Sequence, residues 1–431
     1  MEVLNVCVGG FANIERVSLS LDKFNALIAL NNYGKSNVIK AIEFGIDLIN
    51  GLPEKKSKLM AVRSVIPINK HIDNLPYSFE VNFSIDFENE TSIVSYGFSF
   101  DWIKNDDKGQ KVREEFLKIK SDKPDSKFKT YIKRNTREGL YLPSSTGRCD
   151  KLIKSKKNEL IINKLLSFDD LFYYKIVEAI NDLSLSYIDT LQDPDRLFRR
   201  INPKVIRTGY SLDMPSNSDV GYFIYSLKKQ KPEMYEMFED SVKSLLSGIE
   251  DFEPIEIDFK NKIKFEGEDD NIPLDFPDKI YDIRVKEVNN NQQSNISGLS
   301  SGSQKIFYVL ALTIAAEINE IPLISFEELE NSIHPGLLQK LLIILDGLTE
   351  KTKIITSSHS PYLIQYLDTS KIKIGIPNNK GLAEFKEVRK SKFNKVIKIA
   401  EDEGISVGDL IFDRVIECSN GDYELLNDLC N

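Results

Sequence analysis

The chain has 431 residues, of which 41% are hydrophobic and 29% charged, so it has enough apolar material for two or three globular domains. Its net charge of −9 argues against indiscriminate coating of nucleic acid. No basic-then-apolar leader and no apolar run long enough to cross a bilayer occurs, so we expect no membrane association. The four cysteines are scattered without metal-ligand spacing, which favours free thiols and a cytoplasmic location.

The first elements surround a tight loop. Residues 2–30 have the patterning of three strands, and the third ends in an apolar run from Phe24 to Leu30. A stretch with helical spacing follows and ends near Gly51. Between strand and helix lies the sequence Ala-Leu-Asn-Asn-Tyr-Gly-Lys-Ser at residues 29–36. Strand, tight loop and helix in this order are the setting of a phosphate-binding loop.

The residue types in this loop fit that chemistry. Gly34 lets the backbone approach a phosphate, Lys35 reaches the β- and γ-phosphates, and the Ser36 hydroxyl binds Mg²⁺. Ala29 stands where such loops usually have their first glycine, and an ordinary left-handed turn is the alternative interpretation. The predicted nucleotide-binding residues are Asn31, Asn32, Tyr33, Gly34, Lys35, Ser36 and Asn37.

The middle of the chain is less informative. Residues 77–102 alternate apolar and polar side chains around Glu88-Asn89-Glu90, which predicts an antiparallel hairpin. Helical spacing dominates residues 152–191 and 232–246. We expect an α/β fold, with a mixed sheet and an antiparallel β lobe, interrupted by a mainly helical insertion. The predicted domains are residues 1–100, 101–250, 251–375 and a small helical tail at 376–431.

Positive charge is concentrated between residues 101 and 160, which contain 17 lysines and arginines against 10 aspartates and glutamates. Residues 121–148 in particular are expected to form a loose basic segment, with a strand only at Tyr131-Ile132. Clusters of this kind can contact a phosphate backbone, so DNA is a candidate partner. A solvated basic face is the simpler alternative.

Polar residues follow apolar elements in the last third of the chain. Glu327 and Glu328 end an apolar strand at residues 321–326, and His359 follows the next strand at 353–356. Polar residues at the carboxyl ends of parallel strands form sites in α/β sheets. We expect Glu327 to bind Mg²⁺, Glu328 to polarise the attacking water, and His359 to contact the γ-phosphate or the water. The alternatives are that the acids cap the next helix and that the histidine is structural.

A second anion-binding helix start is predicted at Ser300 and Gly302, before the helix at residues 305–317. One chain rarely needs two such termini for one phosphate. Two copies in head-to-tail contact would use both helix starts, because each copy then contributes its phosphate loop to one nucleotide and its second helix start to the other. The alternative is a helix cap that binds no ligand.

Together these motifs resemble the heads of ABC-type ATPases, and most closely the subgroup that contains the overcoming-lysogenization-defect (OLD) ATPases and stand-alone, SMC-like relatives. The resemblance implies a Walker A loop with Lys35, a signature in trans, a Walker B pair, a D-loop and a switch histidine at His359, with ATP and Mg²⁺ as cofactors. Glu327 departs from the aspartate that many members have. Asn69 is a weak Q-loop candidate. The implied signature residues are Ser300, Gly302 and Gln304, and the implied D-loop residues are Asn331, Ser332 and His334.

The resemblance implies a dimeric ATPase that senses phage or DNA and controls a separate nuclease or toxin in anti-phage defence. The residues after His359 lack the Asp-x-Asp pattern of the OLD-type nuclease and read as two small helices, so we expect any effector to be another protein. A RecF-like DNA-repair ATPase without a toxin partner is the alternative. A scaffold that binds ATP without hydrolysing it is a third reading.

Overall fold

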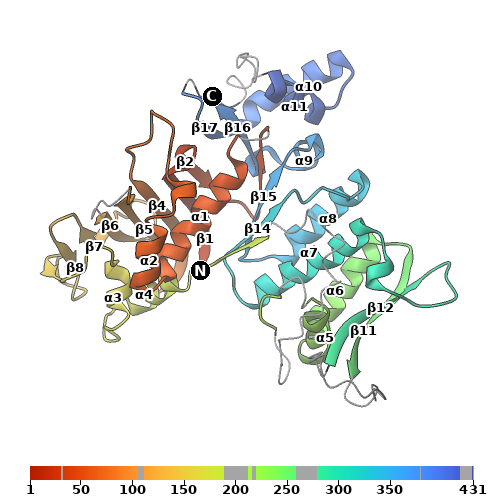
Figure 1. The fold of residues 1–431 in the computed structure, drawn as a ribbon, viewed down its shortest axis with the longest axis horizontal. Helices are drawn as coiled ribbons and strands as arrows, with labels where there is room; N and C mark the ends of the chain where they lie inside the picture. The colour runs from red at the N-terminus through yellow and green to blue at the C-terminus, as the bar shows by residue number, and fades with distance from the viewer. Residues whose placement is uncertain are drawn as a thin grey trace, which may run out of the picture. The chain divides into compact units, whose positions relative to one another are not determined.

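The computed structural model describes residues 1–30, 33–104, 111–188, 212–215, 220–258, 279–378, 380–417 and 430. The chain forms two compact units (Figure 1). Unit 1 comprises residues 1–187, 321–326 and 351–431. Unit 2 comprises residues 188–320 and 327–350.

A largely parallel sheet in unit 1 carries the predicted phosphate loop. Strand β3 pairs in parallel with β15 on one side and β16 on the other. All five residues of β3 are buried, as expected for a central strand covered on both faces. In sheet order the strands are β10 (Leu185–Ile188), β14 (Leu323–Glu327), β15 (Lys353–Ser358), β3 (Phe24–Ile28), β16 (Ile372–Pro377) and β17 (Ala383–Glu387).

An eight-stranded antiparallel sheet forms the predicted β lobe of unit 1. The predicted hairpin is confirmed, because Tyr77 pairs with Phe100 and Phe87 with Glu90. In sheet order the strands are β2 (Ile14–Ser20), β1 (Glu2–Phe11), β4 (Tyr77–Phe87), β5 (Glu90–Asp101), β6 (Lys111–Ser121), β7 (Lys129–Arg134), β8 (Gly139–Tyr141) and β9 (Lys151–Leu152).

Strands β6 to β9 differ from the expected loose basic segment and helical insertion. The predicted strand at Tyr131-Ile132 is confirmed as part of β7, but residues 111–152 extend the antiparallel sheet instead of leaving it. The period-2 signal of β6 is hidden because a charged residue, Glu115, occupies a fully buried inward position between Val112 and Leu117. Within the expected helical insertion at residues 101–250, helices occur only after these strands, from Ile161 onward.

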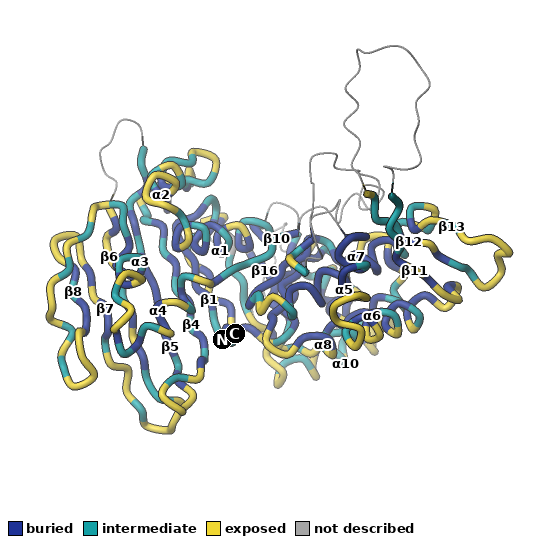
Figure 2. Tube along the Cα trace, turned by 90° about the horizontal axis from the view of Figure 1, so that it is seen from below, coloured by how far each residue is buried: buried dark blue, intermediate teal, exposed yellow. Residues whose placement is uncertain are grey.

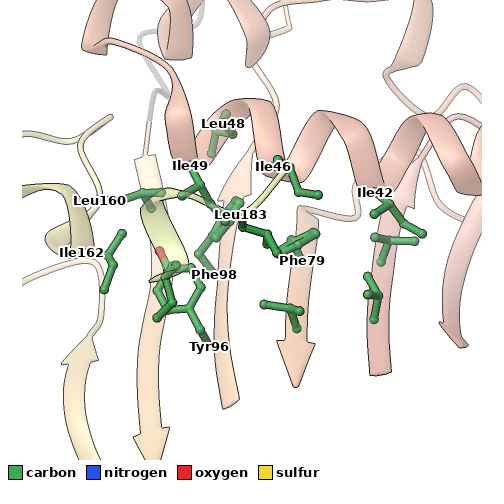
Figure 3. Packing of buried hydrophobic residues seen from close by; sticks show 14 of the residues in the cluster. Ile42, Ile46, Leu48, Ile49, Phe79, Tyr96, Phe98, Leu160, Ile162 and Leu183 are labelled. Atoms are coloured by element: carbon green, nitrogen blue, oxygen red, sulfur yellow. The ribbon is translucent and has the colours of Figure 1, made fainter. Parts of the chain in front are cut away.

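Helices cover one face of this antiparallel sheet. Helix α1 (Lys35–Asn50) directs Ile42, Ile46 and Ile49 toward sheet residues such as Phe79 (Figure 3). The same apolar cluster includes residues of α3 (Ile161–Leu165) and α4 (Tyr174–Asn181). In Figure 2 the buried positions run along the strands, and exposed positions gather at their turns. Helix α2 (Pro53–Leu59) follows α1.

Unit 2 is built around one buried helix. In α7 (Ser301–Ile318) every residue from Gln304 to Ala316 is buried, so this helix is enclosed on all sides. Phe307 of α7 packs against Phe252 in a T-shaped arrangement, with a distance of 5.0 Å between the ring centroids. The other elements are α5 (Val220–Gln230), α6 (Pro232–Leu245), α8 (Pro335–Leu348), β11 (Ile249–Asp258), β12 (Lys279–Glu287) and β13 (Ser294–Asn295).

The last two helices that the structure describes belong to unit 1. The two predicted tail helices are confirmed as α10 (Lys390–Glu403) and α11 (Val407–Glu417). Helix α11 lies directly on the start of α9 (Pro361–Tyr366), since a Cβ at Gly408 would stand 2.2 Å from the Pro361 carbonyl oxygen. Across the described parts of the chain, no helix has the length and apolarity needed to cross a membrane.

Candidate functional site

The predicted phosphate loop joins β3 to α1. Gly34 is the N-cap of α1 and has φ 87° and ψ 11°, a left-handed conformation that glycine adopts without a steric penalty. As the N-cap, Gly34 has no side chain with which to cap the helix, so the N–H groups at this helix start are suited to an anion. Asn31 and Asn32, predicted to bind nucleotide, lie outside the described residues.

Lys35 turns back over the loop. Its ammonium donates to the carbonyl oxygens of Ala29 at 2.7 Å and Leu30 at 3.0 Å. Its Nζ also lies 3.2 Å from Nδ1 of His359, a residue 324 positions away in the chain. The structure therefore brings together two residues that the sequence suggested separately for the same phosphate.

The contact between Lys35 and His359 indicates the hydrogen-bonding role of each ring nitrogen. An ammonium group only donates hydrogen bonds, so Nδ1 of His359 must accept and the ring proton lies on Nε2. His359 follows β15 directly, and Ser358 at the end of that strand pairs with Ile28 of β3. The imidazole is thus a donor through Nε2 beside the phosphate loop.

Other loop residues have different surroundings. Asn37 donates to Asn13 Oδ1 at 2.9 Å, which ties the first turn of α1 to the turn between β1 and β2. Ser36 and Tyr33 are half-buried. The side-chain amide of the Q-loop candidate Asn69 donates to the carbonyl of Lys380, far away in the chain, and accepts from the nearby His71 N–H.

Ala29 is accommodated by a glycine on the neighbouring strand. Gly375 follows Ile374, the partner of Ile28, and a Cβ on it would stand 2.7 Å from the Cβ of Ala29. The methyl group of Ala29 therefore fits at the first position of the loop because Gly375 has no side chain there.

Replacing Gly375 with alanine is expected to destabilise unit 1 by about 1–3 kcal/mol through overpacking. Adding Ala29→Gly should recover part of that loss, and a double-mutant cycle in urea measures the coupling. Gly347→Ala is the control, since a Cβ at Gly347 meets nothing within 4 Å. Additive effects of the two substitutions would contradict this explanation.

Glu327 is the last residue of β14. Strands β14 and β15 run in the same direction, because the Lys353 N–H donates to Pro322 O at 2.9 Å and Thr356 Oγ1 donates to Phe326 O at 3.0 Å. Glu327 thus emerges at the carboxyl edge of the sheet, the edge at which β3 leads into the phosphate loop. Glu327 is only 8% exposed.

The predicted signature lies at the start of α7 in unit 2. Ser300 is exposed and caps the helix, accepting from the Ser303 N–H at 3.2 Å. Gln304 is the last of the three predicted signature residues. It is buried, and its side-chain amide donates to the Leu299 carbonyl at 2.9 Å, so it holds the preceding loop.

The turn after Glu327 is unusual in its backbone. Glu328 has φ 49° and Ser332 φ 65°, both in the left-handed region. The Asn331 side-chain amide donates to the Glu328 carboxylate. A Cβ at Gly302 would stand 2.2 Å from the Ser332 carbonyl oxygen, so the start of α7 lies directly against this turn.

The predicted D-loop residues Asn331, Ser332 and His334 are exposed. His334 is the N-cap of α8 and accepts from the Gly336 N–H through Nδ1 at 3.2 Å. The alternative in which Glu327 and Glu328 cap the next helix is therefore wrong, because a histidine does so.

Sequence reasoning missed one residue in this region. Lys305 is fully buried and donates to two carbonyl oxygens of the turn. The only sequence signal is a lysine at the start of an otherwise apolar helix, a place where a solvated side chain is the usual expectation.

Comparison with known protein families settles the class. Residues 24–365 match the family described as "AAA domain, putative AbiEii toxin, Type IV TA system". The chain belongs to this AAA-domain family. The matched range begins with β3 and ends in α9, so it includes every predicted site residue. The predicted P-loop ATPase class and its α/β head are thereby confirmed.

Other comparisons are more distant. No curated protein matches this AAA-domain chain. Similar solved structures include an SmcHead bound to the C-winged helix domain of ScpA, at 13% identity and a TM-score of 0.44, covering 92% of this chain and all of that one. The SMC head domain from Thermotoga maritima has 14% identity and a TM-score of 0.43, with 90% and 100% covered. A Smc head domain with an extended coiled coil, bound to the C-terminal domain of ScpA derived from Pyrococcus furiosus, has 12% identity and a TM-score of 0.42, with 93% and 99% covered.

Proposed function

We propose that this AAA-domain protein binds and hydrolyses ATP between two head-to-tail copies and uses the cycle to control a separate effector. The observation that carries the ATP-binding part is the convergence of Lys35 and His359 on a glycine-turned helix start. A cation, a neutral imidazole donor and uncapped helix N–H groups together suit a phosphate chain.

Magnesium is expected with the nucleotide. Ser36, half-buried on the first turn of α1, and Glu327, at the carboxyl edge of the sheet, are the residues that would hold it. Hydroxyl and carboxylate oxygens are the ligands that Mg²⁺ prefers. When bound, the ion would neutralise charge that develops on the phosphates.

Two residues are assigned to the hydrolytic step. Glu328 would accept a hydrogen bond from the attacking water and orient it, because it directly follows Glu327, the last residue of the strand. His359 would donate from Nε2 to the γ-phosphate, since Nδ1 is already an acceptor toward Lys35. Both roles rest on residues that follow neighbouring strands of one sheet.

A two-fold dimer would complete the site. Ser300 and the D-loop residues Asn331, Ser332 and His334 are exposed in the single chain. In a head-to-tail pair, the Ser300–Gly302 helix start of one copy would close over the nucleotide on the other copy. Such an interface is isologous and closes with two sites.

The family description mentions a toxin system, which supports control of a toxin or nuclease partner in phage defence. Direct DNA contact is the second candidate, because Lys118 and Lys120 of β6 lie over the Phe116 and Phe128 rings, and Phe128 is 45% exposed. Salt-dependent DNA binding by the purified protein alone would favour a RecF-like role. A toxin or nuclease in the adjacent reading frame that copurifies in an ATP-dependent manner would favour effector control.

The nucleotide site is tested by Lys35→Ala. This variant should lose measurable binding of a fluorescent ATP analogue, because the only cation described at the loop is removed. Lys40→Ala, on the exposed side of the same helix, should bind like the wild type. Equal binding by the wild type and Lys35→Ala would contradict the assignment. Phosphate release at saturating Mg–ATP separates hydrolysis from a scaffold that only binds ATP.

A further inference from the structure

Lys305 is a fully buried lysine on the second turn of α7. Its Nζ donates to the carbonyl oxygen of Glu328 at 2.7 Å and to that of Asn331 at 3.0 Å. A buried ammonium is tolerated only where its hydrogen bonds are satisfied. The turn that carries Glu328 supplies both of these acceptors.

The turn needs such support. Glu328 and Ser332 both have left-handed backbones, with φ of 49° and 65°, which non-glycine residues keep only when their surroundings hold them. The Glu328 carbonyl also accepts from the Asn331 N–H at 3.1 Å. This oxygen therefore has two donors, Lys305 and Asn331, which fix the plane of the peptide bond next to Glu328.

Helix α7 also touches the turn at its first residues. Gly302 leaves no room for a Cβ against the Ser332 carbonyl. The helix thus contacts the turn at Gly302 and donates two hydrogen bonds to it from Lys305. Ser300, the cap of the same helix, stands at its exposed end.

We infer that Lys305 is a positioning residue, which fixes the backbone of Glu328 and so aims its carboxylate. It makes the helix that begins at Ser300 and the turn of Glu328 move as one piece. A partner nucleotide that contacts the start of α7 would thereby act on the position of Glu328. The inference rests on the proposed catalytic role of Glu328.

The charges around Lys305 agree with this role. Burial lowers the pKa of Lys305 to about 8, while the nearby charges of Glu330 and Glu328 act to raise it. The side chain therefore remains mainly protonated at neutral pH, where a charged donor binds carbonyl oxygens most strongly.

The test compares Lys305→Met, which keeps the length but has no donor, with Lys305→Arg, which keeps charge and donors. Lys305→Met should lower kcat for ATP hydrolysis roughly 10- to 100-fold with KM within about threefold, because misplacement of a reacting group affects the chemical step. Lys305→Arg should recover part of kcat. Thr313→Val, which removes a buried hydrogen bond to Val309 on the same helix, is the matched control and should leave kcat unchanged.

Hydrogen exchange gives a readout that does not depend on activity. In Lys305→Met the amides of Asn331 and Ile333 should exchange faster, whereas Thr313→Val should leave them unchanged. A folded Lys305→Met with kcat within about twofold of the wild type, or with unchanged exchange in the turn, would overturn the inference. Should methionine prevent folding, Lys305→Gln takes its place under the same criteria. If Glu328→Gln hydrolyses ATP at the wild-type rate, the proposed function fails, and the exchange measurement still tests the grip of Lys305 on the turn.

Discussion

Replacing Glu328 with glutamine is expected to lower the steady-state rate of phosphate release by about 10²–10³-fold, the usual cost of removing one electrostatic group from a reacting centre. Glutamine keeps the shape of the side chain and can still accept from the Asn331 amide. It loses the negative charge that would orient and polarise water. Nucleotide affinity should change little, since Lys35 and the loop amides remain.

The same variant should accumulate as a closed dimer in Mg–ATP, because binding proceeds and hydrolysis does not. Size-exclusion chromatography with multi-angle light scattering would show a mass near twice that of the chain with ATP and the single-chain mass without it. Glu330→Gln is the control, since it changes a second carboxylate in the same turn. Equal rate losses in both variants would mean that the charge of the turn matters, and not the Glu328 carboxylate itself.

Removing the Glu115 carboxylate is expected to cost about 3–5 kcal/mol of folding stability, the usual loss when one partner of a buried charge network is deleted. Glu115 accepts from the N–H groups of Ile161 at 2.7 Å and Ile162 at 2.9 Å, and from the Tyr96 hydroxyl at 3.2 Å. The guanidinium of Arg134, itself buried, lies 3.9 Å away. Glu115→Ala would leave these donors in the core without an acceptor.

Urea unfolding of Glu115→Ala against the wild type measures this loss. Glu114→Ala, the exposed neighbour on β6, is the matched control and should lie within about 0.5 kcal/mol of the wild type. An equal effect of both substitutions would contradict the buried network. Burial raises the pKa of Glu115, against the opposing effects of its hydrogen bonds and Arg134.

The raised pKa of Glu115 predicts how the stability lost in Glu115→Ala depends on pH. The folded state binds the Glu115 proton more tightly than the unfolded chain, so the stability that it contributes is fully present below the unfolded pKa and falls as pH rises through the folded one. The difference between the wild type and Glu115→Ala should therefore grow as the pH is lowered through the folded pKa toward the unfolded one. A difference that shrinks over this range would contradict the raised pKa.

Local patterns in the sequence predicted most of the head. The apolar run of β3, the glycine of the loop and the spacing of α1 are all read within a few residues, and the structure contains them in that order. The hairpin of β4 and β5 and the two tail helices were predicted in the same way. These elements share a regular period that a short window contains.

Strand β6 was missed because that period is broken within it. Glu115 is a charged residue in a core position, and its partners Ile161, Ile162 and Arg134 are far from it in the chain. A sequence window contains none of these partners, so the position reads as exposed. Buried polar residues are the usual point at which pattern reading fails.

The sequence alone determined which residues this protein has for phosphate chemistry: a glycine-lysine-serine loop, two acids after a strand and a histidine after the next. Only the tertiary structure decided which of them meet. It brought Lys35 to His359, set Gly375 against Ala29 and placed Lys305 on the backbone of Glu328. The physical reason is that these contacts depend on strand order and helix packing across the chain, whereas the motifs depend only on the conformation of a few consecutive residues.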